Sequence, residues 1–196
     1  MLFTIGYSSF FEAEKLLNRL KQENISILYD IRTFPYSNAF PQYNKENLEK
    51  QFNYKFLGNF IGGLKIKNLV KKGISNLKDL TKDKDIKRGL NYIYKQAKYK
   101  NVAIMCAEKS PLDCHRFLAI GSLLHFYTDL EVFNIIEEKT LSFEETVRWW
   151  KEKEKLKELK ISNHNLIFQR LNKIYKIDNK REEKFPKKLE NLKLFN

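Results

Sequence analysis

Short apolar segments alternate with amphipathic ones along the chain, and this pattern predicts strands and helices in turn. Residues 2–6 and 25–32 consist mainly of apolar side chains and are typical of buried strands. Residues 9–22, between them, carry apolar positions at helical spacing. The chain therefore begins with a β-α-β unit, which favours parallel strands joined by a right-handed crossover.

The pattern continues through the rest of the chain. We expect a short strand running into a Gly-Gly loop in 54–64 and further strands at 101–106 and 130–136. Helices are expected at 44–52, 85–99 and 114–127. Residues 33–41, with two prolines, are expected to form a loop, and part of the lysine-rich segment 65–84 to be mobile or irregular.

This alternation predicts an α/β fold: a Rossmann-like three-layer sandwich with a mostly parallel sheet. We expect the α/β domain to comprise residues 1–140. Residues 141–196 would add a helical, basic C-terminal appendage, opened by a capping box in which Ser142 and Glu145 have the required spacing.

Composition narrows the class of protein. At 196 residues and 42% hydrophobic content, the chain can bury a proper core. It contains no apolar stretch of the roughly 18–20 residues that a membrane span needs. Its start lacks the features of a signal peptide, and two cysteines are too few for a disulfide framework. We expect a cytoplasmic protein with no membrane partner.

The charge is strongly positive and unevenly distributed. The formal net charge is +13, and residues 65–100 alone hold 12 basic and 3 acidic side chains. Residues 151–196 form a second basic block. Such blocks suggest a phosphate-bearing ligand or nucleic acid as partner. An equally simple explanation is a compositional bias, since 30 of the 37 basic residues are lysine.

Polar side chains follow three of the predicted strands. The carboxyl ends of parallel strands meet at one edge of a sheet, where α/β proteins bind ligands. This places three groups together: Tyr7 and Ser8 after the first strand; Asp30, Arg32 and Ser37 after the second; Cys106, Glu108 and Lys109 after the third. The sequence therefore predicts a ligand site at this edge.

The segment CAEKSPLDCHR (106–116) favours an anion at this site. Ser110 or Asp113 can cap the helix that follows, and free N–H groups at a helix start attract anions. A cation in the first helical turn, such as Arg116, is unfavourable unless it faces an anion. We expect Arg116 to clamp a ligand; the alternative is a structural pair with Asp30 or Glu108.

The same segment contains both cysteines, which allows two further interpretations. Cys106, Cys114 and His115 could bind zinc with Glu108 as a fourth group, but seven residues separate the cysteines, unlike the short paired spacings of familiar zinc sites. Cys114 beside His115 at a helix start could be a nucleophile. Neither is preferred; we predict no cofactor and leave a metal open as an alternative.

These residues lead to one preferred function and two alternatives. We expect an enzyme acting on a phosphate-bearing ligand (nucleotide, nucleoside or nucleic acid), a hydrolase or transferase at a glycosidic or phosphoester bond. Glu108 and Asp30 are the expected catalytic carboxylates. The expected ligand-binding residues are Tyr7, Ser8, Arg32, Ser37, Lys109, Cys114, His115 and Arg116. The alternatives are a non-catalytic nucleic-acid-binding module and cysteine-based sulfur or redox chemistry.

Taken together, the motifs resemble a known family. TIGYSSF, LYDIRTFPYS, FPQYNKENL, YKFLGNFIGGL and MCAEKSPLDCHR, in this order, are similar to the family called domain of unknown function 488, which is related to YeaO-like proteins. The similarity covers about residues 1–137. It implies a fold and a site, without an established reaction.

The resemblance also implies which positions belong to the site. They are Gly6, Ser8, Asp30, Arg32, Pro35, Ser37, Tyr54, Gly62, Gly63, Cys106, Glu108, Cys114, His115 and Arg116. The family pattern begins T-I-G-H-S, whereas this chain has Tyr7 in place of the histidine. A tyrosine there can still donate a hydrogen bond to a ligand.

Overall fold

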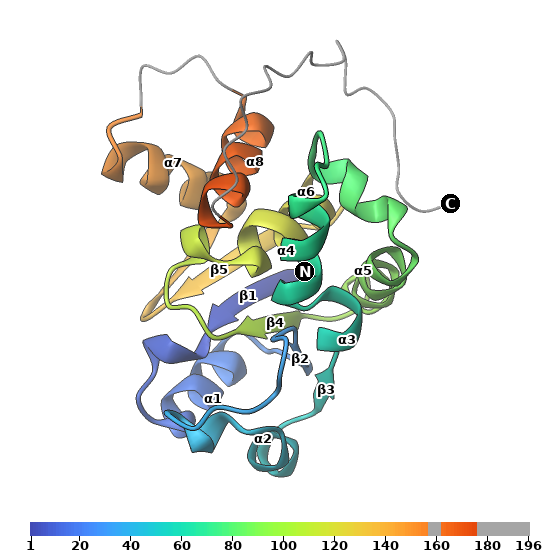
Figure 1. Ribbon diagram of the computed structural model, residues 1–196. Helices are drawn as coiled ribbons and strands as arrows, with labels where there is room; N and C mark the ends of the chain where they lie inside the picture. Colours follow the sequence, from blue (N-terminus) through green and yellow to red (C-terminus); the bar gives the residue numbers. More distant parts are fainter. Residues whose placement is uncertain (157–161, 176–196) are drawn as a thin grey trace.

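The computed structural model describes residues 1–156 and 162–175, and its centre is a six-stranded sheet (Figure 1). In chain order the strands are β1 (Leu2–Gly6), β2 (Ile27–Asp30), β3 (Tyr54–Phe56), β4 (Val102–Cys106), β5 (Val132–Ile136) and β6 (Lys139–Ser142). Their order across the sheet is β3-β2-β4-β1-β5-β6. The first five strands are parallel and β6 is antiparallel to β5.

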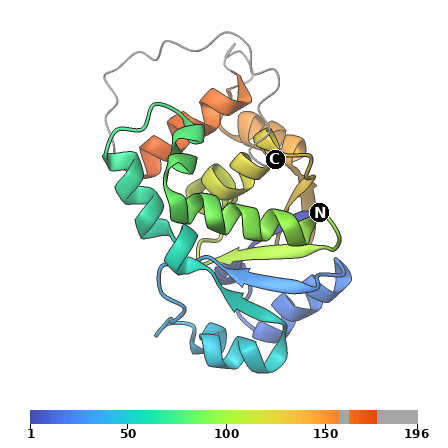
Figure 2. The ribbon, with the colours of Figure 1, turned by 90° about the vertical axis from the view of Figure 1, so that its right-hand side faces the viewer.

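Helices cover both faces of the sheet (Figure 2). One face carries α1 (Ala13–Gln22) and α2 (Lys45–Gln51). The other carries α3 (Gly58–Ile61), α4 (Gly63–Lys71), α5 (Lys84–Ala97), α6 (Ser122–Tyr127), α7 (Phe143–Lys153) and α8 (Asn163–Ile174). The predicted three-layer α/β fold is thus confirmed.

Alternation along the strands creates two cores. Side chains at successive strand positions point to opposite faces. Leu2 therefore belongs to the core under α4 to α8, while its neighbour Phe3 packs with α1 on the other face. Cys106 lies on the same side as Leu2. Cys106, the last residue of β4, therefore points to the face of the sheet that carries α6, the helix that follows β4.

The helices after the predicted domain boundary share this core. Trp150 of α7 is 1% exposed, and Leu171 of α8 is fully buried. The capping box at Ser142 is present as predicted, with Glu145 returning its side chain to the Ser142 amide. The predicted basic tail beyond residue 175 lies outside the described residues.

Several sequence-based predictions are corrected. Within the lysine-rich segment, residues 63–71 form helix α4, because Ile66 and Val70 give it a buried stripe among the lysines, and residues 72–76 form no helix or strand, as expected for part of this segment. The first helix begins at residue 13 instead of 9. Residues 116–121 form a π-helical turn before α6, and strand β6 was not expected.

None of the helices in the described ranges is both long and apolar enough to cross a lipid bilayer.

Candidate functional site

A pocket lies at the carboxyl ends of β1, β2 and β4. The connections after β1 and β2 lead to helices on one face of the sheet, whereas the segment after β4 leads to α6 on the other. A crevice opens where neighbouring connections diverge in this way. The cavity here has a volume of about 540 Å³, and its wall includes Tyr7, Arg32, Glu108 and His115.

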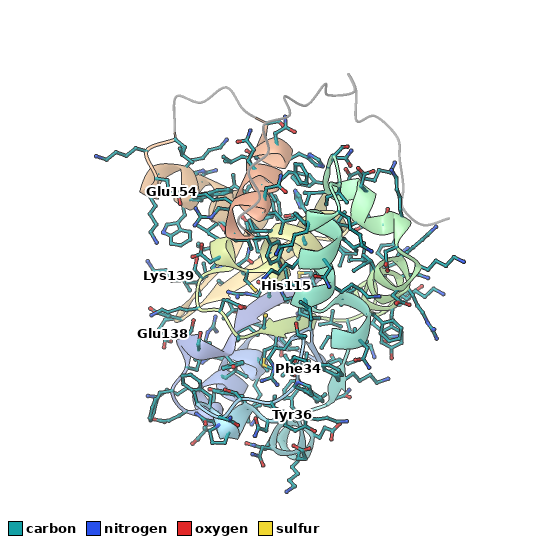
Figure 3. All side chains as sticks on the ribbon, in the orientation of Figure 1. Phe34, Tyr36, His115, Glu138, Lys139 and Glu154 are labelled. Atoms are coloured by element: carbon teal, nitrogen blue, oxygen red, sulfur yellow. The ribbon has the colours of Figure 1, made fainter. Side chains whose placement is uncertain are left out.

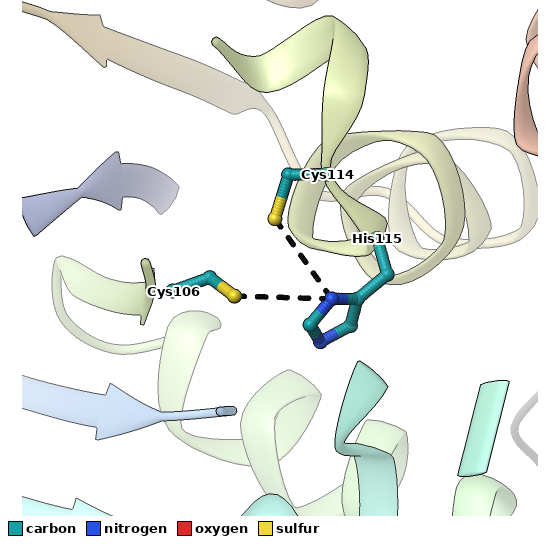
Figure 4. Close-up of side chains that lie close together, drawn as sticks. All are labelled: Cys106, Cys114 and His115. Carbon is teal, nitrogen blue, oxygen red and sulfur yellow. Dashed lines mark hydrogen bonds between the residues drawn. The ribbon is translucent and has the colours of Figure 1, made fainter. Parts of the chain in front are cut away.

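Four reactive side chains meet in this cavity. Cys106 ends β4, and Cys114 and His115 immediately precede the π-helical turn. The His115 Nδ1 atom lies 3.9 Å from the Cys106 sulfur and 3.8 Å from the Cys114 sulfur (Figure 4). Glu108 Oε2 accepts from both thiols, at 2.9 and 3.0 Å. The cysteines and His115 are buried, while Glu108 remains open to solvent.

The protonation pattern of His115 follows from its other ring nitrogen. Nε2 lies 3.0 Å from the carbonyl oxygen of Ile31, which can only accept a hydrogen bond. In the neutral imidazole Nε2 therefore carries the proton, and the Nδ1 lone pair faces the two sulfurs. Gly63 packs against this ring, where a Cβ would lie only 3.2 Å from Nδ1. A glycine at this position leaves room for the ring.

The groups alter one another's ionisation. A hydrogen bond with Cys114 and burial raise the pKa of Cys106. Burial alone would raise the pKa of Cys114, but the Cys106 hydrogen bond and the charges of Arg116 and His115 lower it. Although Glu108 as a residue is open to solvent, partial desolvation of its carboxylate raises its pKa, and the Cys114 charge adds to this. Cys114 is thus the more acidic thiol.

Arg116 holds the loop that carries Glu108. Its guanidinium is fully buried and donates to the carbonyl oxygens of Glu108 and Lys109. A side chain at Gly6 would collide with the same Glu108 carbonyl. Arg116 does not line the cavity. Its hydrogen bonds position the backbone of residues 108–109 and do not form the side-chain pair with Asp30 or Glu108 that was the alternative prediction.

Asp30 also has a structural role, because it orients the side chain of Arg32. Its carboxylate is completely buried and accepts from Arg32 Nε and Nη2 and from the Tyr54 hydroxyl, the last at 2.7 Å. Asp30 does not line the cavity. Its oxygens are already occupied, so the prediction of a catalytic Asp30 has to be revised: this carboxylate orients Arg32.

Arg32 does reach the cavity. It is 4% exposed, and among the described residues its Nη1 atom has no hydrogen-bond partner. Its guanidinium also lies 5.1 Å from the centre of the Tyr7 ring. Tyr7 stacks on Tyr43, with ring centres 4.8 Å apart. This pair supports the position of Arg32, whose side chain lines the cavity and keeps one buried donor without a partner among the described residues.

Besides Arg116, three predicted ligand-binding residues lie outside the cavity wall. The Ser8 amide donates to the carbonyl of Ala107. Ser37 orders its own loop, because its hydroxyl accepts from the Phe40 amide. Lys109 pairs with Glu137. These residues support the loops around the site.

The structure adds wall residues that the sequence reasoning missed. Phe34 and Tyr36 lie on the loop after β2, 71% and 54% exposed (Figure 3). Lys67 comes from α4, and Tyr175 follows α8 and donates to the Gly63 carbonyl. Aromatic side chains in a polar, proline-containing loop were a usable signal for the first two. No comparable signal marks Tyr175.

The fold and the site define a class: a three-layer α/β protein with thiol, imidazole and carboxylate groups gathered at the carboxyl edge of its sheet. The family described as domain of unknown function DUF488 matches residues 12–122, which is more than half of the chain. The chain belongs to this family, as its motifs suggested. No curated protein and no solved structure was found to match it.

Proposed function

We propose that the protein is an enzyme that acts on a small phosphate-bearing ligand of the nucleotide class. The observation that carries the proposal is the position of Glu108. Its carboxylate stands beside two thiols and an imidazole at the wall of a ligand-sized cavity, open to solvent. Among the described residues it forms no ion pair. A carboxylate in this position is free to exchange protons with a bound ligand.

The wall of the cavity supports the ligand class. Arg32 and Lys67 line the cavity and bring positive charge to it, and the buried Nη1 atom of Arg32 has no partner among the described residues. The exposed rings of Phe34 and Tyr36 offer flat surfaces on which a base can stack. Charge and aromatic surface on the same wall favour a nucleotide over inorganic phosphate alone.

In the reaction, Glu108 accepts the proton of an attacking hydroxyl group or water. The oxygen then forms a bond to phosphorus or to the anomeric carbon, and the leaving group departs with its bonding electrons and takes up a proton. Arg32 and Lys67 stabilise the phosphate charge during this step. Asp30 acts only by holding Arg32. Cleavage of a phosphoester or a glycosidic bond fits this arrangement equally.

The first experiment is a turnover screen. The chain is incubated with nucleoside 5′-phosphates, nucleosides and short oligonucleotides, and products are separated by chromatography. We expect Glu108→Gln to lower turnover by roughly 10²–10⁴-fold, the usual contribution of an acid–base group. Glu138→Gln, an exposed carboxylate outside the cavity, is the matched control and should leave turnover unchanged. Equal turnover by wild type and Glu108→Gln contradicts the role of Glu108.

A binding experiment tests the ligand class separately. Calorimetry should show weaker nucleotide binding for Lys67→Ala and Phe34→Ala. Lys71→Ala and Phe11→Ala change exposed residues of the same types outside the cavity and serve as controls. If all four variants bind as the wild type does, the ligand lies elsewhere. Oligonucleotide binding that falls steeply with salt and ignores these positions would favour the nucleic-acid-binding module instead.

A further inference from the structure

We propose that Cys106, Cys114 and His115 form a binding site for one zinc ion, with its fourth coordination position facing the cavity beside Glu108. This inference deepens the proposed function and rests on it only for the use of the ion, not for its binding. The three ligand atoms come from the end of β4 and from the start of the π-helical turn (Figure 4). All of them lie within 4.8 Å of one another.

The distances suit a tetrahedral ion. Zinc binds sulfur at about 2.3 Å and nitrogen at about 2.0–2.1 Å, which places tetrahedral ligand atoms roughly 3.5–3.8 Å apart. The two Nδ1-to-sulfur distances of 3.9 and 3.8 Å differ from this range by a few tenths of an ångström or less. The two sulfurs lie within 4.8 Å of each other, so the cysteine side chains would rotate toward each other to complete the site.

The surroundings of His115 support the assignment independently. A histidine that binds zinc almost always donates its other N–H to a carboxylate or carbonyl group. The contact of Nε2 with the Ile31 carbonyl does this, and it directs the unprotonated Nδ1 to the sulfurs. Gly63 packs on the ring and limits its movement. The imidazole is thus held in the orientation that a ligand requires.

The two thiols would also supply charge for a cation once they lose their protons. Two buried thiols share the same carboxylate oxygen of Glu108. Burying ionised groups is costly unless they are paired or coordinate a metal. A divalent ion balances two thiolates, and the backbone amide of Arg116 already points to the Cys114 sulfur at 3.4 Å. Such an N–H contact to sulfur is favourable for a ligating thiolate.

Because the fourth coordination position of the zinc ion faces the cavity, it could take part in the reaction. Three protein ligands with one open position are the pattern of catalytic zinc, whereas structural zinc is usually closed by four. A water in the open position becomes acidic and loses its proton near neutral pH. Glu108 is placed to take that proton. The resulting hydroxide would then bond to the electrophilic atom of the ligand, and the leaving group would recover the proton from Glu108.

Zinc content tests the site directly. The full chain is loaded with zinc, passed over a desalting column and analysed for zinc and protein. We expect about one zinc per chain in the wild type, in Glu108→Gln and in the control His125→Gln, whose histidine lies outside the cluster. Cys114→Ser and His115→Ala should retain at least tenfold less. Wild-type chain that retains less than a tenth of an equivalent overturns the proposal, and so does unchanged zinc content in both ligand variants.

Cobalt substitution identifies the ligands and does not depend on the variants folding well. Wild-type protein loaded with Co(II) should show the intense visible bands of a tetrahedral ion and a thiolate-to-cobalt charge-transfer band. Zinc should also protect both cysteines from alkylation, and a chelator should remove that protection. A six-coordinate cobalt spectrum, cysteines alkylated at equal rates with and without zinc, or a Cys106–Cys114 disulfide in the reduced preparation contradicts the site.

The two proposals can fail separately. If the wild type binds zinc but no ligand of the nucleotide class, the metal site stands and the proposed function fails. If nucleotides bind and turn over in metal-free protein, the function stands and the metal site has no part in it.

Discussion

Two clusters of charged or ionisable groups lie at neighbouring strand ends, and they differ in how fully their hydrogen bonds are satisfied. Around Asp30, every carboxylate oxygen is occupied by Arg32 or Tyr54, and the carboxylate is completely buried. Around Glu108, one oxygen serves two thiols and the residue is open to solvent. A saturated cluster supports the fold, while an unsaturated one beside a cavity can take a ligand.

The largest expected effect comes from breaking the saturated cluster. Asp30→Asn leaves the Arg32 guanidinium buried without a charged partner. Removing one partner of a buried pair typically costs about 3–5 kcal/mol. We expect a loss of this size in the free energy of unfolding, measured by urea denaturation. A loss below about 1 kcal/mol would mean that the Asp30 cluster does not support the fold.

The matching change in the second cluster should have a small effect on stability. Glu108→Gln keeps the size of the side chain and leaves an amide oxygen that can still accept from the thiols, in a residue that is open to solvent. We expect the free energy of unfolding to change by less than about 1 kcal/mol, since such sites contribute little. Urea denaturation of metal-free protein measures it. A loss as large as that of Asp30→Asn would remove the distinction between the two clusters.

The smallest expected effect is on the pH dependence of stability, and it arises at His164, which belongs to neither cluster. Burial lowers the pKa of His164, which contacts the Tyr127 hydroxyl between α6 and α8. His164 therefore binds a proton more readily in the unfolded chain than in the folded one. As the pH falls below about 6.5, the ordinary pKa of histidine, protonation of His164 favours unfolding and lowers the free energy of unfolding. Stability should therefore decline less between pH 7.5 and pH 5.5 in His164→Gln than in the wild type. Identical declines would contradict this role.

How far the sequence predicted these clusters depends on what each contact requires. Apolar strands that alternate with amphipathic helices are local sequence patterns, and they predict a parallel sheet. The convergence of Asp30, Cys106 and Glu108 at one edge of that sheet could therefore be foreseen. The partners of each side chain could not. Arg116 has a side chain suited to binding an anion, but it donates to two backbone carbonyl groups, and this contact depends on the path of the loop.

The cysteines illustrate the same limit. Seven residues between Cys106 and Cys114 argued against a shared metal, because familiar sites use shorter spacings. The 3₁₀ turn at Pro111–Asp113 folds the segment back, so that both sulfurs lie under 4 Å from His115 Nδ1. Spacing along the chain is a poor guide where a turn closes the distance. Tyr175 reaches the cavity only through the packing of α8, which strand and motif patterns do not describe.

The central claim is that the cavity beside Glu108, and not the basic surface, is the functional site. Backbone NMR spectra recorded during a titration with nucleoside 5′-monophosphates test this most directly, because each amide reports its own surroundings. We predict shifts concentrated at residues 32–36, 63–67 and 106–116, with the amides of α5 unchanged. Shifts confined to the lysines of α5, or no shifts at saturating nucleotide, would contradict the account.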